Sequence, residues 1–335
     1  MTVKLALLGA GRIGQVHARA ISGIGGAALV AVADPLEAAA STVAHEYNCR
    51  VASIDEIAGI EDLDGVLICT PTNTHADLIE RFARLGKAVF CEKPVDLDLQ
   101  RVKACLEVVR EAGAPLMLGF NRRFDPHFAA VRKAIVDGKV GAVEQVSITA
   151  RDPGLPPFEY IDVSGGIFRD MTIHDFDIAR FLLGEEISGV QATASVLVDP
   201  RVAEHDDFDT VTVVMTTADG KQCTIQNSRR ATYGYDQRLE VFGSAGMLTA
   251  ENQRPVSIEL ANSEGFTRPQ LHDFFMTRYM DAYAAEIRAF VRTISEGTSP
   301  CPAGEDGLFA LALAEAAIKS VEEGRKVQVS EVLST

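Results

Sequence analysis

The stretch from Val3 to Ile21 constrains the fold of this chain more than any other. Val3–Leu8 is almost continuously apolar, which is the pattern of a parallel strand buried on both faces. It is followed by Gly9-Ala10-Gly11-Arg12-Ile13-Gly14 and then by a helix-like stretch, Gln15–Ile21. A G-x-G-x-x-G motif between a strand and a helix is typical of a dinucleotide site, because its glycines allow a tight turn, close approach of a pyrophosphate and close helix packing. The residues expected to contact this cofactor are Gly9, Gly11, Arg12, Ile13 and Gly14.

A carboxylate follows the second predicted strand. The apolar run Ala28–Ala33 ends at Asp34, about 20 residues beyond the last glycine of the motif, where an acid binds the adenosine ribose hydroxyls. A carboxylate at this position repels a 2′-phosphate, so the sequence predicts NAD rather than NADP. The alternative is that Asp34 is only a turn residue before Pro35.

The next strand and its turn extend the same pattern. Gly65–Cys69 is apolar and ends at the polar turn Thr70-Pro71-Thr72-Asn73-Thr74-His75. Ligands of open parallel sheets bind where the strands end, so we expect Thr70, Pro71, Asn73 and His75 to border the cofactor. His75 begins the helix predicted over 76–85, and we interpret it as a cap or a cofactor neighbour rather than as a base.

A lysine at the end of a strand is the first candidate for chemistry. The apolar run Ala88–Cys91 leads into Glu92-Lys93-Pro94, and the proline ring restricts the backbone next to the Lys93 ammonium. We expect Glu92 and Lys93 to lie near the cofactor, and Lys93 to be catalytic. The alternative is a solvated lysine, which is the commoner case for lysines in general.

The alternation of strands and helices stops near Asn121. We therefore expect residues 1–121 to form a Rossmann domain with a doubly wound parallel sheet, and residues 122–335 to form a second domain. Strands that follow one another without helices imply antiparallel pairing. The strands predicted in this second part are Val143–Arg151, Val190–Val198, Thr210–Thr217, Lys221–Ser228, Arg238–Phe242 and Val256–Leu260. Helices are predicted over Tyr279–Ser295 and Leu308–Glu323.

A second candidate group lies between these strands. Asp170, His174 and Asp177 are spaced i, i+4 and i+7, which places them on one side of any helix that they share. A carboxylate within reach of an imidazole fixes its tautomer and stabilises the imidazolium, so the histidine becomes a better base. The alternative is that both aspartates are surface charges and that His174 only packs.

Composition limits the partners. The formal net charge is −15 and the pI is about 4.9, which disfavours nucleic acid and anionic membranes. The six cysteines form no C-x-x-C pair, and no charged leader precedes the first strand, so we expect a reduced, cytoplasmic compartment. The histidines and cysteines are scattered without the spacing of metal ligands, so no metal is expected.

With these motifs in view, the chain resembles the glucose-fructose oxidoreductase and inositol dehydrogenase family, and within it the inositol 2-dehydrogenases. The resemblance covers essentially the whole chain. It is carried by the glycine motif, by Glu92-Lys93-Pro94, by residues 119–125 and by residues 170–177. It implies an α/β fold in which a Rossmann domain precedes an α/β domain with a large open antiparallel sheet, usually assembled into homotetramers.

The resemblance also implies roles for single residues. Lys93, Asp170 and His174 would be the catalytic set, and the cofactor would be NAD. Arg123 and Asp177 would contact the substrate, and Tyr235, in a turn-rich stretch, is a further substrate-binding candidate. The implied reaction is the oxidation of a cyclic polyol, myo-inositol, to scyllo-inosose. The alternatives are a dehydrogenase for scyllo-inositol, another cyclitol or an aldose, and, more distantly, a non-catalytic NAD-binding regulator.

Overall fold

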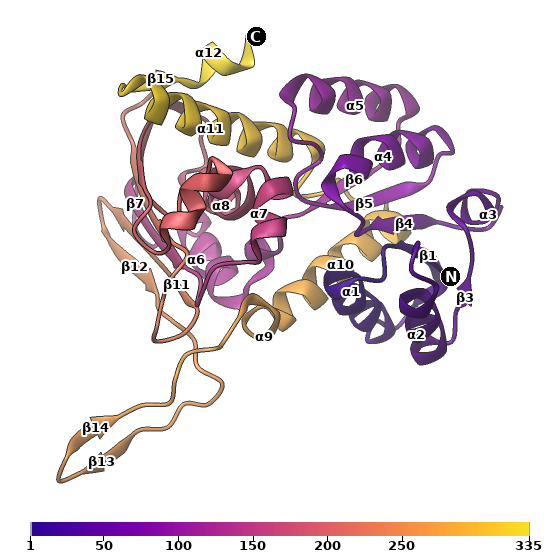
Figure 1. Ribbon diagram of the computed structural model, residues 1–335, viewed down its shortest axis with the longest axis horizontal. Coiled ribbons are helices and arrows are strands. Elements are labelled where there is room, and N and C mark those ends of the chain that lie inside the picture. Colours follow the sequence, from indigo (N-terminus) through magenta and orange to yellow (C-terminus); the bar gives the residue numbers. More distant parts are fainter. Residues whose placement is uncertain (1, 335) are drawn as a thin grey trace. The chain divides into compact units, whose positions relative to one another are not determined.

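The computed structural model describes residues 2–334, which form two compact units (Figure 1). The first unit contains the residues up to Asp125 and Met280–Leu311, and the second contains Pro126–Tyr279 and the residues from Ala312 onward. This division differs from the one expected at residues 121/122, because Met280–Leu311 belongs to the first unit. Helix α10 (Met280–Glu296) explains the difference, since its Ile287, Phe290 and Val291 lie in the hydrophobic core of the first unit.

The first unit contains a six-stranded parallel sheet in the order β3-β2-β1-β4-β5-β6. The doubly wound parallel sheet predicted from the sequence is confirmed. The strands are β1 (Val3–Leu8), β2 (Ala27–Ala33), β3 (Arg50–Val51), β4 (Gly65–Ile68), β5 (Ala88–Glu92) and β6 (Leu116–Gly119). The helices are α1 (Arg12–Ser22), α2 (Glu37–Tyr47), α3 (Ile54–Ala58), η1 (Thr72–Thr74), α4 (His75–Arg84), α5 (Leu99–Ala112) and η2 (Asn121–Phe124), together with α10.

Strand order in this sheet determines where the site lies. Strands β1, β4 and β5 are neighbours and run in the same direction, so the turns that follow them meet at one edge of the sheet. The order changes direction between β1 and β4, and this switch point is the usual place for a ligand in an open α/β sheet. The glycine turn, the Thr70 turn and Lys93 all follow these three strands.

The second unit contains a seven-stranded sheet in the order β12-β11-β7-β10-β9-β8-β15. Its strands are β7 (Val143–Arg151), β8 (Ile187–Ser195), β9 (Thr210–Thr217), β10 (Gln222–Ser228), β11 (Asp236–Gly243), β12 (Gly246–Ala250) and β15 (Val327–Gln328). Its helices are α6 (Pro126–Val136), α7 (Phe158–Ser164), the π turn η3 (Phe168–Thr172), α8 (Ile173–Leu183), η4 (Pro200–His205), α9 (Phe275–Arg278) and α12 (Val329–Leu333). Helix α11 (Gly304–Glu323) begins in the first unit and ends in the second.

The large antiparallel sheet expected from the sequence is a mixed sheet, because β7 and β10 are parallel. Strands β8, β9 and β10 follow one another as antiparallel neighbours, as expected. Between β7 and β8, however, the chain passes through α7, η3 and α8. A two-residue hairpin would force the next strand to run antiparallel to β7, whereas a helical connection allows either direction.

The strand predicted over Val256–Leu260 is also wrong. The chain instead forms a short separate hairpin of β13 (Leu260–Asn262) and β14 (Gly265–Thr267), and only Leu260 of the predicted strand is part of it. Val256 and Ile258 are exposed. Alternation of side chains predicts which face a strand buries, but it does not supply the neighbouring strand with which to pair.

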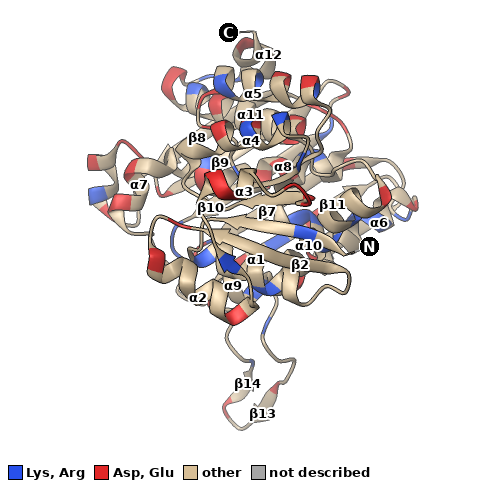
Figure 2. Cartoon of the chain, turned by 90° about the vertical axis from the view of Figure 1, so that its right-hand side faces the viewer, with Lys and Arg blue, Asp and Glu red and all other residues tan. Residues whose placement is uncertain are grey.

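The seven-stranded sheet has one buried and one open face. In β9, Val211, Val213 and Met215 are buried, whereas Thr212 and Val214 between them are exposed. Helices cover the buried face, and Ser320 of α11 accepts a hydrogen bond from the Ala192 N–H of β8 at 2.9 Å. Strands β9 and β10 contain no charged residue, and Figure 2 shows the charges concentrated on helices and loops.

Candidate active site

The three glycines of the motif have three different environments. Gly9 has a φ of +96°, and a Cβ on it would lie 2.5 Å from the Cys69 carbonyl oxygen. A Cβ on Gly14 would lie 2.0 Å from the Gly9 carbonyl oxygen, so α1 packs directly on the turn. A Cβ on Gly11 would meet no protein atom within 4 Å. The turn thus requires its first and third glycines for its own packing, and its second glycine leaves space for a ligand.

Helix α1 begins at this open position. Gly11 is its N-cap and provides no capping side chain, and the first turn contains no acidic residue. The first N–H groups of α1 therefore remain available for an anion, and the helix dipole favours one. The donor set and the space beside Gly11 fit the pyrophosphate of a dinucleotide.

Asp34 follows β2 and supports the glycine turn. Its Oδ2 accepts a hydrogen bond from the Ala10 N–H at 2.7 Å, and its Oδ1 accepts one from the Leu36 N–H at 2.8 Å. Each carboxylate oxygen has a second lone pair, so these bonds leave capacity for ribose hydroxyls. Asp34 therefore has a structural role as well as the predicted ribose contact, which stays a prediction.

The turn after β4 is held by short internal bonds. The Thr70 and Thr74 hydroxyls lie 2.6 Å apart, and the Thr74 hydroxyl donates to the Pro71 carbonyl at 2.8 Å. Pro71 and Asn73 are exposed. His75 begins α4, as predicted, but it is buried, and its two ring nitrogens each lie 2.7 Å from a backbone carbonyl oxygen.

Lys93 directly follows β5, as predicted, and is half-buried. The Glu92 carboxylate before it accepts a hydrogen bond from Nε2 of the buried His17 at 2.6 Å. A Cβ on Gly119, which pairs with Glu92 in the sheet, would lie 2.9 Å from Glu92 Oε2. The side chain of Glu92 is thus enclosed, whereas its role as a cofactor contact remains a prediction.

The second unit contains Asp170, His174 and Asp177. Asp170 lies in the π turn η3, and His174 and Asp177 lie on the following helix α8. Asp177 is fully buried and the Asp170 side chain is mostly buried, so neither is a surface charge. π turns inside helices are frequent at functional sites, because they change which side chains face one direction.

Asp170 has two partners that the sequence did not suggest. The Tyr160 hydroxyl donates to Asp170 Oδ1 at 2.9 Å, and NH1 of Arg229 donates to Asp170 Oδ2 at 3.2 Å. Arg229 is buried and also lies 3.6 Å from Asp207 Oδ2. Burial raises the pKa of the Asp207 carboxyl, although a hydrogen bond from the Ile167 N–H and the charge of Arg229 oppose this shift.

The remaining candidates for substrate binding have protein contacts of their own. Arg123 is buried, and its NH2 donates to Asp306 Oδ1 at 2.9 Å. Tyr235 is also buried, and its ring packs edge-on against Phe274 and Tyr279. Both assignments stay predictions.

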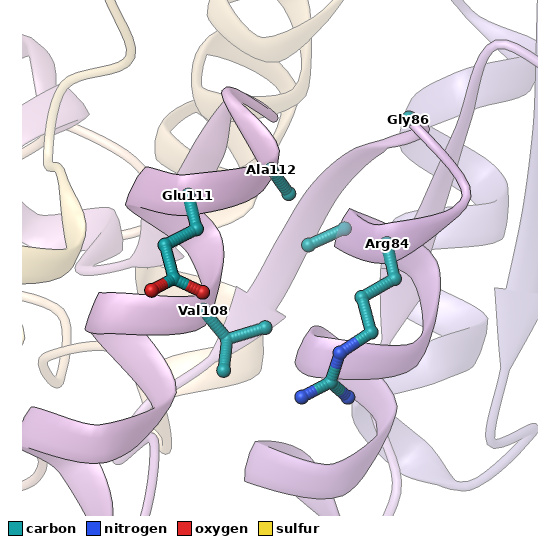
Figure 3. Close-up of a pocket in the computed structure, with 6 residues that line it drawn as sticks. Arg84, Gly86, Val108, Glu111 and Ala112 are labelled. Atoms are coloured by element: carbon teal, nitrogen blue, oxygen red, sulfur yellow. The ribbon is translucent and has the colours of Figure 1, made fainter.

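Two surface hollows lie away from these residues. One hollow, of about 320 Å³, lies between the C-terminal ends of α4 and α5, with Arg84 and Glu111 on its two sides (Figure 3). Because helices α4 and α5 run antiparallel to the strands, this hollow lies at the opposite edge of the sheet from Lys93. Another hollow lies beside α2 and is lined by Ser41, Thr42, His45 and Glu46.

The described residues contain neither a metal-binding cluster nor a helix that could span a membrane. Within residues 2–334, no group of three or more His, Cys, Asp or Glu side chains is arranged to hold a metal ion. All six cysteines are unpaired thiols, and burial raises the pKa of Cys69, Cys91, Cys105 and Cys223. No helix in the same range is long and apolar enough to cross a membrane.

Comparison with known proteins identifies the family. Residues 3–120 match the family described as "Oxidoreductase family, NAD-binding Rossmann fold", and residues 128–249 match the "GFO/IDH/MocA C-terminal domain". The chain belongs to the GFO/IDH/MocA oxidoreductase family. The predicted resemblance, the α/β fold class and the NAD cofactor are therefore confirmed for this GFO/IDH/MocA protein.

Full-length relatives are also similar to it. An inositol 2-dehydrogenase of Rhizobium meliloti (strain 1021) is 63% identical over 330 residues, which cover 98% of this chain and 100% of that protein. A myo-inositol 2-dehydrogenase of Thermotoga maritima is 43% identical, with 99% and 100% covered. The structure of scyllo-inositol dehydrogenase from Lactobacillus casei with bound NAD(H) and scyllo-inositol matches with a TM-score of 0.91 at 29% identity, and covers 98% of this chain and 100% of that one.

Proposed function

We propose that this chain is an NAD-dependent dehydrogenase of cyclic polyols, which oxidises myo-inositol at C2 to scyllo-inosose. The observation that carries the proposal is 63% identity over 98% of the chain to an inositol 2-dehydrogenase. The open position at Gly11 and the unshielded start of α1 support the cofactor part of it.

The proposed mechanism assigns one step to each side chain. His174 accepts the proton of the substrate hydroxyl, which as general base catalysis is worth about 100- to 10,000-fold in rate. Lys93 donates a hydrogen bond to the same oxygen and stabilises its developing negative charge. Asp170, held by Tyr160 and Arg229, assists His174. NAD, when bound, would accept the hydrogen of the alcohol carbon as a hydride, together with its electron pair.

Substrate contacts complete the proposal. Arg123, Asp177 and Tyr235 bind the remaining hydroxyl groups of the ring. The glycine motif, Asp34, the turn at Thr70, Pro71, Asn73 and His75, and Glu92 and Lys93 form the NAD site.

A second candidate substrate is scyllo-inositol, because a structural relative contains it together with NAD(H). A polyol panel distinguishes the candidates: purified protein and NAD are mixed with myo-inositol, scyllo-inositol, another cyclitol or an aldose, and NADH absorbance is followed. We expect the highest kcat/KM with myo-inositol. A higher kcat/KM with another compound would identify that compound as the substrate. NAD binding without turnover of any compound would indicate a regulator.

The cellular setting is proposed as well. We infer a cytoplasmic protein, because all six cysteines are unpaired thiols. We also infer a homotetramer, as the family resemblance implies, built through the open face of the seven-stranded sheet, which exposes uncharged side chains such as Thr212 and Val214. Light scattering of the purified protein tests this assembly.

A further inference from the structure

We propose that two buried histidines, His17 and His75, clamp the main chain on the two sides of Lys93 and are positioning residues for the reaction. This inference rests on the proposed function, because it concerns the lysine that donates to the substrate oxygen. All of the contacts that carry it lie within the first unit.

His17 fixes the residue before Lys93. It lies on α1, is fully buried, and its Nε2 is 2.6 Å from Glu92 Oε1. Its ring packs edge-on against Phe90 and Tyr283, with centroids 5.0 and 5.6 Å away. Because a carboxylate oxygen accepts, the hydrogen bond places a hydrogen on Nε2.

The second ring nitrogen supports the same tautomer. Nδ1 of His17 is buried and has no hydrogen-bond partner within residues 2–334. A hydrogen on Nδ1 would be a buried donor without an acceptor, which is more costly than an unused lone pair. His17 therefore directs its Nε2–H at Glu92.

Glu92 cannot move away from this donor. Its backbone pairs with Gly119 in the parallel sheet, and its Oε2 lies in the space that a side chain at position 119 would fill. Helix α1 lies on one side of the carboxylate and strand β6 on the other. The last residue of β5 is thereby fixed in both its main chain and its side chain.

His75 fixes the residue after Lys93. Its Nδ1 lies 2.7 Å from the Pro94 carbonyl oxygen, and its Nε2 lies 2.7 Å from the Thr70 carbonyl oxygen. The imidazole is 2% exposed, so water does not compete for these contacts. The ring thus lies between the turn after β5 and the turn after β4, and its N–H donates to one of the two carbonyls.

Lys93 is therefore the one residue between two fixed neighbours. The helices that bring the histidines, α1 and α4, begin at the two turns predicted to contact NAD. The parts of the fold that bind the cofactor and the part that carries the ammonium are consequently held by the same two side chains. A shift of about 1 Å in a reacting group costs on the order of 100-fold in rate, so this support affects turnover directly.

Leucine and glutamine replacements test the clamp. His17→Leu and His75→Leu fill the space without donating, and we expect kcat to fall about 100-fold in both. In His17→Leu, whose residue is not assigned to the NAD site, the NAD dissociation constant should change far less. The glutamines in His17→Gln and His75→Gln restore one donor, and we expect kcat to return to within about tenfold of wild type. Val43→Ala, a buried change in α2, is the control for loss of core packing, and it should lower the melting temperature without this loss of kcat.

Two results would overturn the clamp. One is wild-type kcat in folded His17→Leu and His75→Leu, and the other is an equal loss of NAD affinity and kcat in His17→Leu that His17→Gln does not rescue. If wild type itself oxidises no polyol, the proposed function fails, and hydrogen exchange then decides the clamp alone. In that case we expect amide exchange over residues 91–95 to accelerate about tenfold in the leucine variants and not in Val43→Ala, and unchanged exchange would contradict the clamp.

Discussion

Arg229 and Asp170 form an ion pair across 59 positions of sequence, with NH1 3.2 Å from Oδ2. On its other side, the same buried guanidinium lies 3.6 Å from Asp207. Two carboxylates therefore share one cation inside the second unit. The pair matters for chemistry because Asp170 is the proposed partner of the base His174.

Replacing Arg229 with glutamine removes the shared cation and leaves two buried carboxylates without a counter-charge. We expect the free energy of unfolding to fall by about 3–5 kcal/mol and turnover to fall with it. Arg230→Gln is the matched control, because Arg230 is the exposed neighbour and its guanidinium donates to the Leu197 carbonyl at 3.3 Å. Equal denaturation midpoints for the two variants would contradict this role of Arg229.

The glycine turn predicts opposite results for two alanine substitutions. Gly11→Ala meets no protein atom, so the variant should fold with an almost unchanged melting temperature but bind NAD at least about tenfold more weakly, because the methyl group occupies ligand space. Gly14→Ala would place Cβ 2.0 Å from the Gly9 carbonyl, so it should be strongly destabilised. Calorimetry and thermal melts measure both effects. Tight NAD binding by folded Gly11→Ala would contradict the predicted pyrophosphate position.

Asp34→Ser tests the choice of cofactor. Removal of the carboxylate removes the repulsion of a 2′-phosphate, so kcat/KM with NADP should rise relative to that with NAD. NAD affinity should also fall, because Asp34 supports the Ala10 N–H of the glycine turn. Glu37→Ser, an exposed acid in the first turn of α2, controls for the loss of one negative charge. If the ratio of kcat/KM with NADP to kcat/KM with NAD is the same in both variants, Asp34 does not contact the adenosine ribose.

His174→Ala tests the proposed base. We expect turnover to fall about 100- to 10,000-fold, with NAD affinity nearly unchanged, because the imidazole acts on the substrate hydroxyl. His127→Ala removes an exposed histidine of α6 and should behave as wild type. Steady-state kinetics with the best polyol and NAD titration give the two readouts. Wild-type kcat in His174→Ala would exclude it as the base.

Asp236 gives a prediction for acid stability. Burial favours the neutral acid, but hydrogen bonds from Arg238, Tyr233 and Asn252 outweigh it, so the pKa of Asp236 lies below the usual aspartate range. Because the pKa of Asp236 is lower in the folded state, the ionised carboxylate stabilises the fold above about pH 4. This stabilisation is lost as the pH falls through the folded-state pKa. The difference in unfolding free energy between wild type and Asp236→Asn should therefore be constant near neutral pH and shrink in acid. Asp219→Asn, in an exposed turn, controls for the lost charge, and a difference that grows in acid would contradict the assignment.

The fold was predictable where strands are long and buried. Val3–Leu8 and Thr210–Thr217 have the bounds that their apolar patterns predicted, because burial imposes those patterns directly. Strand β12 was missed because most of its residues are exposed. Strand β15 was missed because its two residues are too few to show an alternation of apolar and polar side chains. The parallel β7–β10 pair was missed because strand direction depends on the whole connection between strands rather than on any local signal.

The site was predictable as a set of motifs but not as a set of contacts. The positions of Lys93 after β5 and His174 on α8 follow from local sequence. The partners of Asp170 do not, because Arg229 comes from the end of a distant strand and an arginine there has no distinguishing pattern. The enclosure of Glu92 by His17 was missed for the same reason, since 75 positions separate the two residues.

The return of α10 to the first unit has a consequence for how the chain is built during synthesis. Strands β1–β6 are complete by Gly119, yet Ile287, Phe290 and Val291 belong to the same core. A growing chain that has made only the parallel sheet therefore carries an apolar face that its own N-terminal half cannot cover. The core of the nucleotide-binding unit is complete only after most of the second unit has been synthesised. A gene fragment that stops near residue 121 would therefore yield an incompletely folded, aggregation-prone product.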